Sequence, residues 1–285
     1  MNEHARIPLV TGLSFAPLTP TIGAEVSGID LAEPLDQDVL AELRAGLLEW
    51  KVLFFRDQDI TTDEHLAFAH SFGELEVHPF APQKPGHPEV LAITHNRESR
   101  GRENTWHSDV TWREKPSLGS VLRALEIPPV GGDTLFADMY AAYEGLSDAV
   151  KETIEGRVAL HDFAHFRVGL RKRGKSEEEI DGFNRAYPAV EHPIVRTHPE
   201  TGRRGLYVNA GFTQHIVGMA KDESDALLRH LYAQAAIPEY QCRFRWEVNS
   251  IAFWDNRASQ HYAVSDYWPA VRRMERVTIV GDRPY

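Results

Sequence analysis

Three residues, His107, Asp109 and His261, carry side chains of the kinds that together bind a divalent metal ion. His107 and Asp109 lie two apart in the strand-like stretch TWHSDVTW (105–112), so alternation would place both on one face. His261 follows a second strand-like run, IAFW (251–254). Two histidines and a carboxylate form the facial triad of non-haem Fe(II) oxygenases, but zinc accepts the same ligands with water as the fourth. The alternative for the His–Asp pair is the polar face of a half-buried edge strand.

Two arginines near the C-terminus favour iron. If the stretch is extended, Arg272 and Arg276 share one face, while Arg273 and Glu275 share the other. A guanidinium that points into a protein interior is costly unless it meets an anion. Because the planar fork of arginine binds carboxylate or sulfonate through two hydrogen bonds, a 2-oxo acid cosubstrate that chelates iron is expected to place its far carboxylate on an arginine. The alternative is that both arginines pair with surface acids.

Composition restricts the class of protein. The chain has 285 residues, 42% of them hydrophobic and 26% charged, as expected for a globular protein. A net charge of −11 argues against nucleic-acid binding. A single cysteine, Cys242, excludes an intrachain disulfide and fits a reducing, cytoplasmic compartment. The first ten residues, MNEHARIPLV, do not have the pattern of a signal peptide, and no apolar run approaches the roughly 18 residues of a membrane span.

The elements that must position these residues are mostly short strands. Strands are predicted at VLFF (52–55), VLAIT (90–94), SVLRAL (120–125), TLFAD (134–138), GLYVN (205–209), IAFW (251–254) and RVTIVG (276–281). Helices are predicted in VLAELRAGLLEW (39–50) with Asp38 as cap, in HLAFAHSF (65–72) after the capping box of Thr61 and Glu64, and in ESDALLRHLYAQA (223–235) from Asp222. Strands that do not alternate regularly with long helices indicate a sandwich, barrel or jelly roll. The charged stretch RKRGKSEEEIDGF (171–183) is interpreted as a solvated loop or helix, with a lid over the site as the alternative.

Several motifs in fixed order resemble one enzyme family. The order is H-x-D (His107, Asp109), GGDT (131–134), WDNRASQHYA (254–263) and RRMERVTIVGDRP (272–284). It resembles the taurine dioxygenase family of Fe(II)- and 2-oxoglutarate-dependent oxygenases, and the resemblance covers nearly the whole chain. It implies a mainly β fold with flanking helices (α+β), the double-stranded β-helix or cupin-like jelly roll. We therefore expect one domain over residues 1–285, a helical or loop insert at about 140–200, and a homo-oligomer.

The resemblance also implies roles for individual residues. Iron is assigned to His107, Asp109 and His261, and the distal carboxylate of 2-oxoglutarate to Arg272 with the hydroxyl of Thr134. The anion of a small organic substrate is assigned to Arg276, His78 and the backbone N–H of Val110, with Phe212 as a pocket wall. O2 is the co-reactant. Hydroxylation of a carbon that bears a sulfonate would release sulfite and an aldehyde.

The sequence departs from taurine-specific members at two positions. Ala81 stands where they carry a tyrosine, and Glu103 where they carry an asparagine, so taurine or a related alkylsulfonate is expected with taurine itself in doubt. A second aromatic wall has no clean match, and either Phe166 or Arg167 falls nearby. The alternatives are a dioxygenase for an alkyl sulfate or an aryloxyalkanoate and, more distantly, a zinc hydrolase or a non-catalytic β-barrel binding module.

Overall fold

The computed structural model describes residues 11–79, 81–101 and 103–285, so the N-terminal segment MNEHARIPLV lies outside the described residues. The helices are α1 (Gln37–Trp50), α2 (Thr62–His70), α3 (Met139–Glu144), α4 (Asp148–Ile154), α5 (Ala164–Lys172), α6 (Glu177–Ala186), α7 (Lys221–Gln234) and the 3-10 turn η1 (Pro238–Tyr240). The first strands are β1 (Ser14–Pro17), β2 (Ala24–Ser27), β3 (Val52–Phe55), β4 (Gln83–Lys84), β5 (His87–His95), β6 (Gly119–Glu126), β7 (Thr134–Asp138) and β8 (Val158–His161). The remaining strands are β9 (Val190–Pro193), β10 (Val195–Thr197), β11 (Arg204–Leu206), β12 (Thr213–Ile216), β13 (Gln241–Phe244), β14 (Ile251–Asp255), β15 (Ser259–Ala263) and β16 (Arg272–Ile279).

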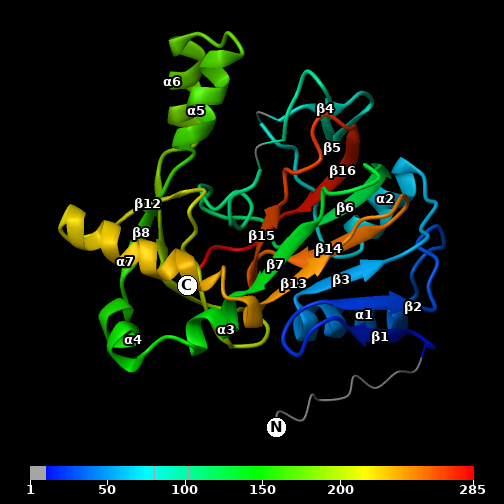
Figure 1. Cartoon of the computed structure of the whole chain (residues 1–285), viewed down its shortest axis with the longest axis horizontal. Coiled ribbons are helices and arrows are strands. Elements are labelled where there is room, and N and C mark those ends of the chain that lie inside the picture. Colours follow the sequence, from blue (N-terminus) through cyan, green and yellow to red (C-terminus); the bar gives the residue numbers. More distant parts are fainter. Residues whose placement is uncertain (1–10, 80, 102) are drawn as a thin grey trace.

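Two facing sheets form a jelly roll, as expected from the sequence (Figure 1). The larger sheet has the strand order β1-β2-β3-β14-β6-β16-β5-β4, and the smaller has the order β13-β7-β15. One core packs α1 and α2 against the outer face of the larger sheet, and a second core lies between the sheets. Leu53 and Phe55 of β3 join the first core, whereas Val52 and Phe54 join the second. Because both faces of this strand are covered, the run VLFF is apolar throughout.

Strand β16 shows how alternation places the two arginines. Arg272, Met274 and Arg276 face the interior between the sheets, where Met274 joins the second core. Glu275 points to the opposite face and forms an ion pair with Lys84, and its neighbour Val277 on that face joins the core under the helices. The prediction that Arg272 and Arg276 share one face is therefore confirmed, and that face is the inner one.

A helical hairpin projects from the body of the protein. Helices α5 and α6 (green in Figure 1) stand apart from the sheets, beyond the ends of β8 and β12. An ion pair of Arg171 with Glu177 joins the two helices, and Lys175 in the turn between them pairs with Glu179 of α6. The charged stretch 171–183 thus forms parts of two helices and the turn between them, which agrees with its interpretation as a solvated loop or helix.

Three local predictions were wrong. Residues 105–112 do not form a strand: His107 makes an isolated bridge, and turns follow it. Helix α1 is capped by Asp36 and not by Asp38, since the Asp36 side chain accepts the N–H of Val39. Helix α7 begins at Lys221, so Asp222 lies inside its first turn. The capping box of Thr61 and Glu64 is confirmed. None of the helices in the described residues has the length and apolar character to cross a membrane.

Candidate active site

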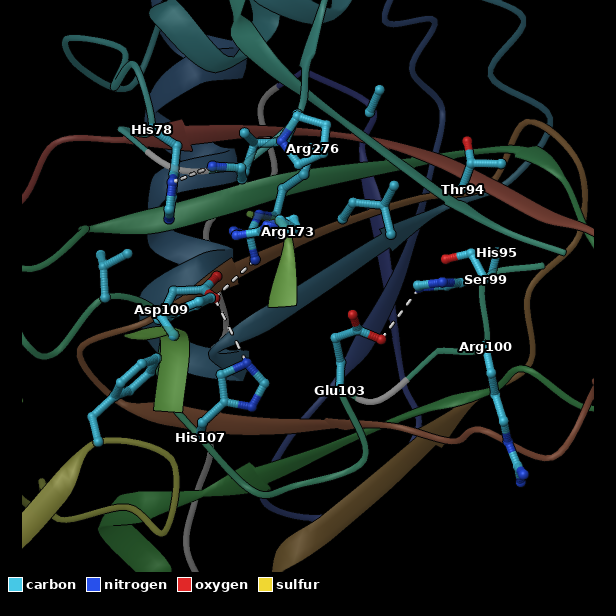
Figure 2. A pocket seen from close by; sticks show the side chains of 18 of the residues that line it. His78, Thr94, His95, Ser99, Arg100, Glu103, His107, Asp109, Arg173 and Arg276 are labelled. Atoms are coloured by element: carbon cyan, nitrogen blue, oxygen red, sulfur yellow. Dashed lines mark hydrogen bonds and ion pairs between the residues drawn. The ribbon is translucent and has the colours of Figure 1, made fainter. Parts of the chain in front are cut away.

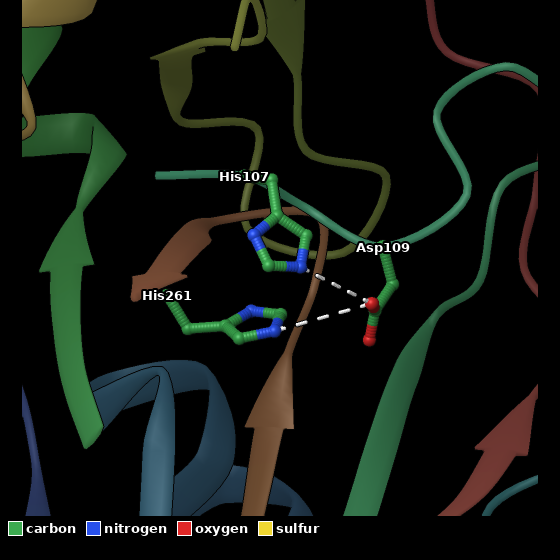
Figure 3. A group of neighbouring side chains, drawn as sticks. All are labelled: His107, Asp109 and His261. Carbon is green, nitrogen blue, oxygen red and sulfur yellow. Dashed lines mark ion pairs between the residues drawn. The ribbon is translucent and has the colours of Figure 1, made fainter. Parts of the chain in front are cut away.

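A backbone bridge sets the two histidines side by side. The N–H of His107 donates to the carbonyl of His261 at 3.1 Å, and the N–H of His261 donates to the carbonyl of His107 at 2.8 Å. Their ring centroids lie 4.2 Å apart. Asp109 completes the group, with its Oδ1 3.7 Å from Nε2 of His107 and 3.9 Å from Nε2 of His261 (Figure 3). One ligand atom from each of the three residues lies within 4.8 Å of the others.

The protonation states suit a metal. Nδ1 of His107 donates to the carbonyl of Thr105 at 2.7 Å, which orients the ring so that Nε2 faces the triad. Burial, and then the proximity of His107, lowers the pKa of His261 to about 3, so the His261 ring is neutral at neutral pH. Burial works to raise the pKa of Asp109, but Arg276 and the two histidines outweigh it and hold this pKa well below its usual range.

The Asp109 carboxylate is held on both oxygens. Nη1 of Arg276 donates to Oδ1 at 2.8 Å, and the hydroxyl of Ser120 on β6 donates to Oδ2 at 3.2 Å. The backbone of Asp109 is held by Asn256, whose Oδ1 accepts the Asp109 N–H at 2.6 Å while its Nδ2 donates to the Asp109 carbonyl at 3.0 Å. The buried Asn256 side chain thus supplies the pair of hydrogen bonds that a neighbouring strand would otherwise supply.

We predict that Asn256→Ala lowers the free energy of unfolding by about 2–4 kcal/mol, because the buried backbone groups of Asp109 and the side chain of Ser117 lose their partners. The variant should also bind Fe(II) about 10- to 100-fold more weakly, as expected for the loss of a group that orients a metal ligand. Urea unfolding and a metal titration measure the two effects. Wild-type iron affinity in the variant would contradict this orienting role.

A cavity of about 600 Å³ opens on one side of the triad. His107, Asp109 and Arg276 line it close to one another, and His78 lies on the same side (Figure 2). Glu103 forms an ion pair with His95 at 3.2 Å, and both residues line the wall opposite His78 (Figure 2). Burial and then the charge of Arg276 lower the pKa of His78 to about 3, and its Nδ1 accepts the N–H of Ala81 at 3.2 Å.

A smaller cavity lies on the other side of the triad, between the sheets. His261, Thr134 and Arg272 line it together. Arg272 is 5% exposed, and its guanidinium lies 5.9 Å from the rings of both Trp246 and Tyr267. Burial lowers the pKa of Arg272, and its buried Nε has no partner. In the part of the chain that the structure describes, no carboxylate pairs with this side chain, so a buried cation faces the cavity without an anion.

The structure brings the candidate site residues to two adjoining cavities. His78, Val110, Phe212 and Arg276 line the larger, Thr134 and Arg272 line the smaller, and the triad stands between them. Phe166 lines the larger cavity and stacks on Phe212 at 6.0 Å, whereas Arg167 pairs with Asp162 instead. Sequence reasoning missed Asn256 and Ser120 as supports of Asp109, and Arg173 as a cavity-lining residue.

The residues fit both groups that this type of site would bind. Two imidazoles and one carboxylate converge at one point, the donor set typical of a facial Fe(II) site. The unpaired, buried guanidinium of Arg272 fits the far carboxylate of a 2-oxo dicarboxylic acid, and the Thr134 hydroxyl accepts a hydrogen bond from Trp246 beside it.

Comparisons with known proteins agree with this arrangement. Residues 14–278 match the profile of the family described as taurine catabolism dioxygenase TauD, TfdA family. An alkylsulfatase from Acinetobacter baylyi is 36% identical over 275 residues, which cover 95% of this chain and 86% of that protein. An alpha-ketoglutarate-dependent sulfate ester dioxygenase from Pseudomonas putida is 35% identical over 285 residues, covering 98% and 93%. The crystal structure of a taurine dioxygenase from Burkholderia xenovorans superimposes with a TM-score of 0.82 at 40% identity, covering 95% and 90%.

These matches exclude a zinc hydrolase and a non-catalytic binding module as the class of this protein. They also agree with the jelly-roll fold. The chain belongs to the TauD/TfdA family and is a 2-oxoglutarate-dependent dioxygenase that works with Fe(II), 2-oxoglutarate and O2.

Proposed function

We propose that the protein oxidises an alkyl sulfate ester or alkylsulfonate at the carbon next to the anionic group. The observation that carries the proposal is the position of Arg276, which lines the larger cavity together with the triad residues His107 and Asp109. The product hydroxylated at that carbon would break down to an aldehyde. A sulfate ester would release sulfate in this step, and a sulfonate would release sulfite. The proposal is thus broader than taurine, to which Ala81 and Glu103 already raised an objection from the sequence.

On the metal side, His107, Asp109 and His261 would hold Fe(II), and Arg272 with Thr134 would hold the far carboxylate of 2-oxoglutarate. When bound, iron and 2-oxoglutarate activate O2 for attack on a C–H bond. The protein supplies orientation and electrostatics. Asp109 stays ionised and His261 stays neutral because both of their pKa values are lowered, so these two ligands are ready to bind at neutral pH without losing a proton.

On the substrate side, Arg276, His78 and the N–H of Val110 would hold the anion. Arg276 is paired with Asp109, so an incoming sulfate or sulfonate group would share this guanidinium with that carboxylate. Among the described residues, no acceptor is found for the Val110 N–H, which leaves it available to an anion at the cavity wall. Holding the anion positions the adjacent carbon toward the metal, which is how a binding group raises the rate without reacting.

The cavity wall favours a substrate with an alkyl body over taurine. Leu91 and Ile93 of β5 line it together with Phe166 and Phe212, and Ala81 leaves space where a tyrosine would stand. Burying alkyl carbons against such a wall contributes about 0.8 kcal/mol per CH₂. We therefore expect kcat/KM to rise with chain length from two carbons to about six. An aryloxyalkanoate, whose carboxylate suits Arg276 equally well, is the second candidate.

The experiment is a substrate panel with Fe(II), 2-oxoglutarate and O2, in which succinate is measured beside sulfate, sulfite and phenol. The panel contains taurine, straight-chain sulfonates and sulfate esters of two to eight carbons, and a phenoxyalkanoate. Succinate matched by sulfate or sulfite supports the proposal, and the released anion tells ester from sulfonate. Succinate matched by phenol alone would replace it with the aryloxyalkanoate alternative.

We also propose that residues 1–285 act as one domain, with the segment at about 140–200 as an insert, and that the protein is a cytoplasmic homo-oligomer. The buried free thiol of Cys242 supports a reducing compartment. Light scattering of the purified chain would test the oligomeric state.

A further inference from the structure

Four buried residues behind the larger cavity form a closed ring of hydrogen bonds, three of them between side chains and one from a backbone N–H. Oγ1 of Thr111 lies 3.0 Å from Nδ1 of His161, and Nε2 of the same ring lies 3.3 Å from Oγ1 of Thr213. Thr213 Oγ1 accepts the backbone N–H of Asn209 at 3.0 Å, and Nδ2 of Asn209 donates to Thr111 Oγ1 at 3.0 Å. The ring therefore closes on itself through Thr111, His161, Thr213 and Asn209.

The ring is buried. Thr111, His161 and Asn209 have no exposed surface, and Thr213 is 8% exposed. Burial, and then the proximity of His192, lowers the pKa of His161 well below its usual value, so its imidazole is neutral, with one nitrogen that donates and one that accepts. In either tautomer, one of the two threonine hydroxyls donates to the imidazole and the other accepts from it. Each of the four residues has two partners in this buried network, which makes it rigid, and losing one member takes a partner from two others.

The ring joins the three segments that build the substrate side of the site. Thr111 follows the metal ligand Asp109 by two residues, and His161 ends β8, which leads into the α5–α6 hairpin. Oδ1 of Asn209 accepts the N–H of Phe212 at 2.9 Å, and the Phe212 carbonyl accepts the N–H of Asp162 at 3.0 Å. The wall residue Phe212 is thus held from both sides by groups of the ring or next to it.

The backbone between Asp109 and Thr111 needs such support. Val110 adopts φ of 47°, a conformation that β-branched residues rarely adopt because the side chain crowds the backbone. Strained residues of this kind persist only where the surroundings fix them, and they gather at functional sites. Asn256 fixes the backbone before Val110, and the ring fixes the side chain after it.

We propose that the ring of Thr111, His161, Asn209 and Thr213 is a positioning device for the substrate: it holds the Phe212 wall and the strained Val110 in fixed relation to the metal ligands. The inference rests on the proposed function. The cosubstrate side does not use this device, because Thr134 and Arg272 lie on β7 and β16, whose strand pairing fixes them. Loss of the ring should therefore affect the substrate and not 2-oxoglutarate.

The test compares Thr111→Val, which keeps the shape of the side chain and removes the hydroxyl, with Thr111→Ser, which restores it. The control is Ser224→Ala, which removes a buried hydroxyl that accepts the N–H of Ile216 away from the cavity. With the best substrate of the panel, Thr111→Val should raise KM about 10- to 100-fold and form more succinate than oxidised product. KM for 2-oxoglutarate should stay within about twofold, and Thr111→Ser should be close to wild type. Thr111→Val and Ser224→Ala should each lower Tm by a few degrees, but Ser224→Ala should keep the wild-type KM for the substrate and for 2-oxoglutarate.

A second readout does not depend on activity. Amide hydrogen exchange at residues 207–213 should be faster in Thr111→Val than in wild type, and unchanged in Ser224→Ala. If wild type turns over no compound, the proposed function fails while the exchange measurement still tests whether the ring fixes this wall. Unchanged exchange in Thr111→Val, or equal rises of KM for substrate and 2-oxoglutarate, would overturn the inference.

Discussion

Asp109→Ala is expected to leave a folded protein that neither retains iron nor forms succinate. The carboxylate is the anionic ligand of the triad, since the low pKa of Asp109 keeps it ionised. Losses of groups that merely orient a metal ligand cost about 10- to 100-fold in affinity, so loss of the ligand itself should cost more than about 100-fold. Iron per chain after anaerobic loading and desalting, and succinate formation, measure the two effects.

The control must separate loss of the metal from loss of stability. Asp109 is also the ion-pair partner of Arg276, and breaking a buried pair costs about 3–5 kcal/mol because one charge is left alone. The double variant Asp109→Ala/Arg276→Met removes both charges and should recover much of that stability without recovering iron. Arg276→Met alone should keep iron and raise KM for the substrate. Normal iron content and turnover in Asp109→Ala would refute the metal assignment.

The elements most accessible from the sequence are those whose pattern is local. The run VLFF was predicted correctly because a strand covered on both faces is apolar throughout, and β16 because alternation gives its two faces different side chains. The stretch 105–112 was misread because its pattern resembles a strand, whereas the hydrogen bonds of Asp109 come from a side chain 147 residues away. The start of α1 was misplaced since both Asp36 and Asp38 can cap a helix, and only the helix boundary decides between them.

The supporting residues of the site were beyond sequence reasoning for the same reason. Thr111, His161 and Asn209 are ordinary polar residues in their own segments, and they form a ring only after segments 50 and 98 residues apart meet. The order of motifs located the candidate ligands, yet not the groups that hold them. One signal was available in the sequence. The strand IAFW is followed by Asp255 and Asn256, a pair typical of a turn, and the side chains of such residues can form hydrogen bonds with backbone groups.

Arg272 carries a cost in the absence of its ligand. Its guanidinium is buried, its Nε has no partner, and burial lowers its pKa. Such a group is retained for what it binds, because replacing a buried charge by an apolar residue of similar volume is often neutral or stabilising by about 1–4 kcal/mol. A substitution at position 272 that removes the charge should therefore maintain or raise the stability of the free protein while it weakens the binding of 2-oxoglutarate.

We predict that Arg272→Met has an unchanged or higher Tm without 2-oxoglutarate, a KM for 2-oxoglutarate raised about 100-fold, and no stabilisation by that ligand. Two lost charge-assisted hydrogen bonds at about 1.5 kcal/mol each account for the KM effect. The matched control is Arg273→Met. The Arg273 side chain lies on the other face of β16, is 53% exposed and is 3.5 Å from Glu126, so its loss should leave KM for 2-oxoglutarate unchanged. Pyruvate is a 2-oxo acid that lacks the far carboxylate. When it replaces 2-oxoglutarate, wild type and Arg272→Met should therefore turn over at the same low rate. An unaltered KM for 2-oxoglutarate in Arg272→Met would remove this arginine from the cosubstrate site.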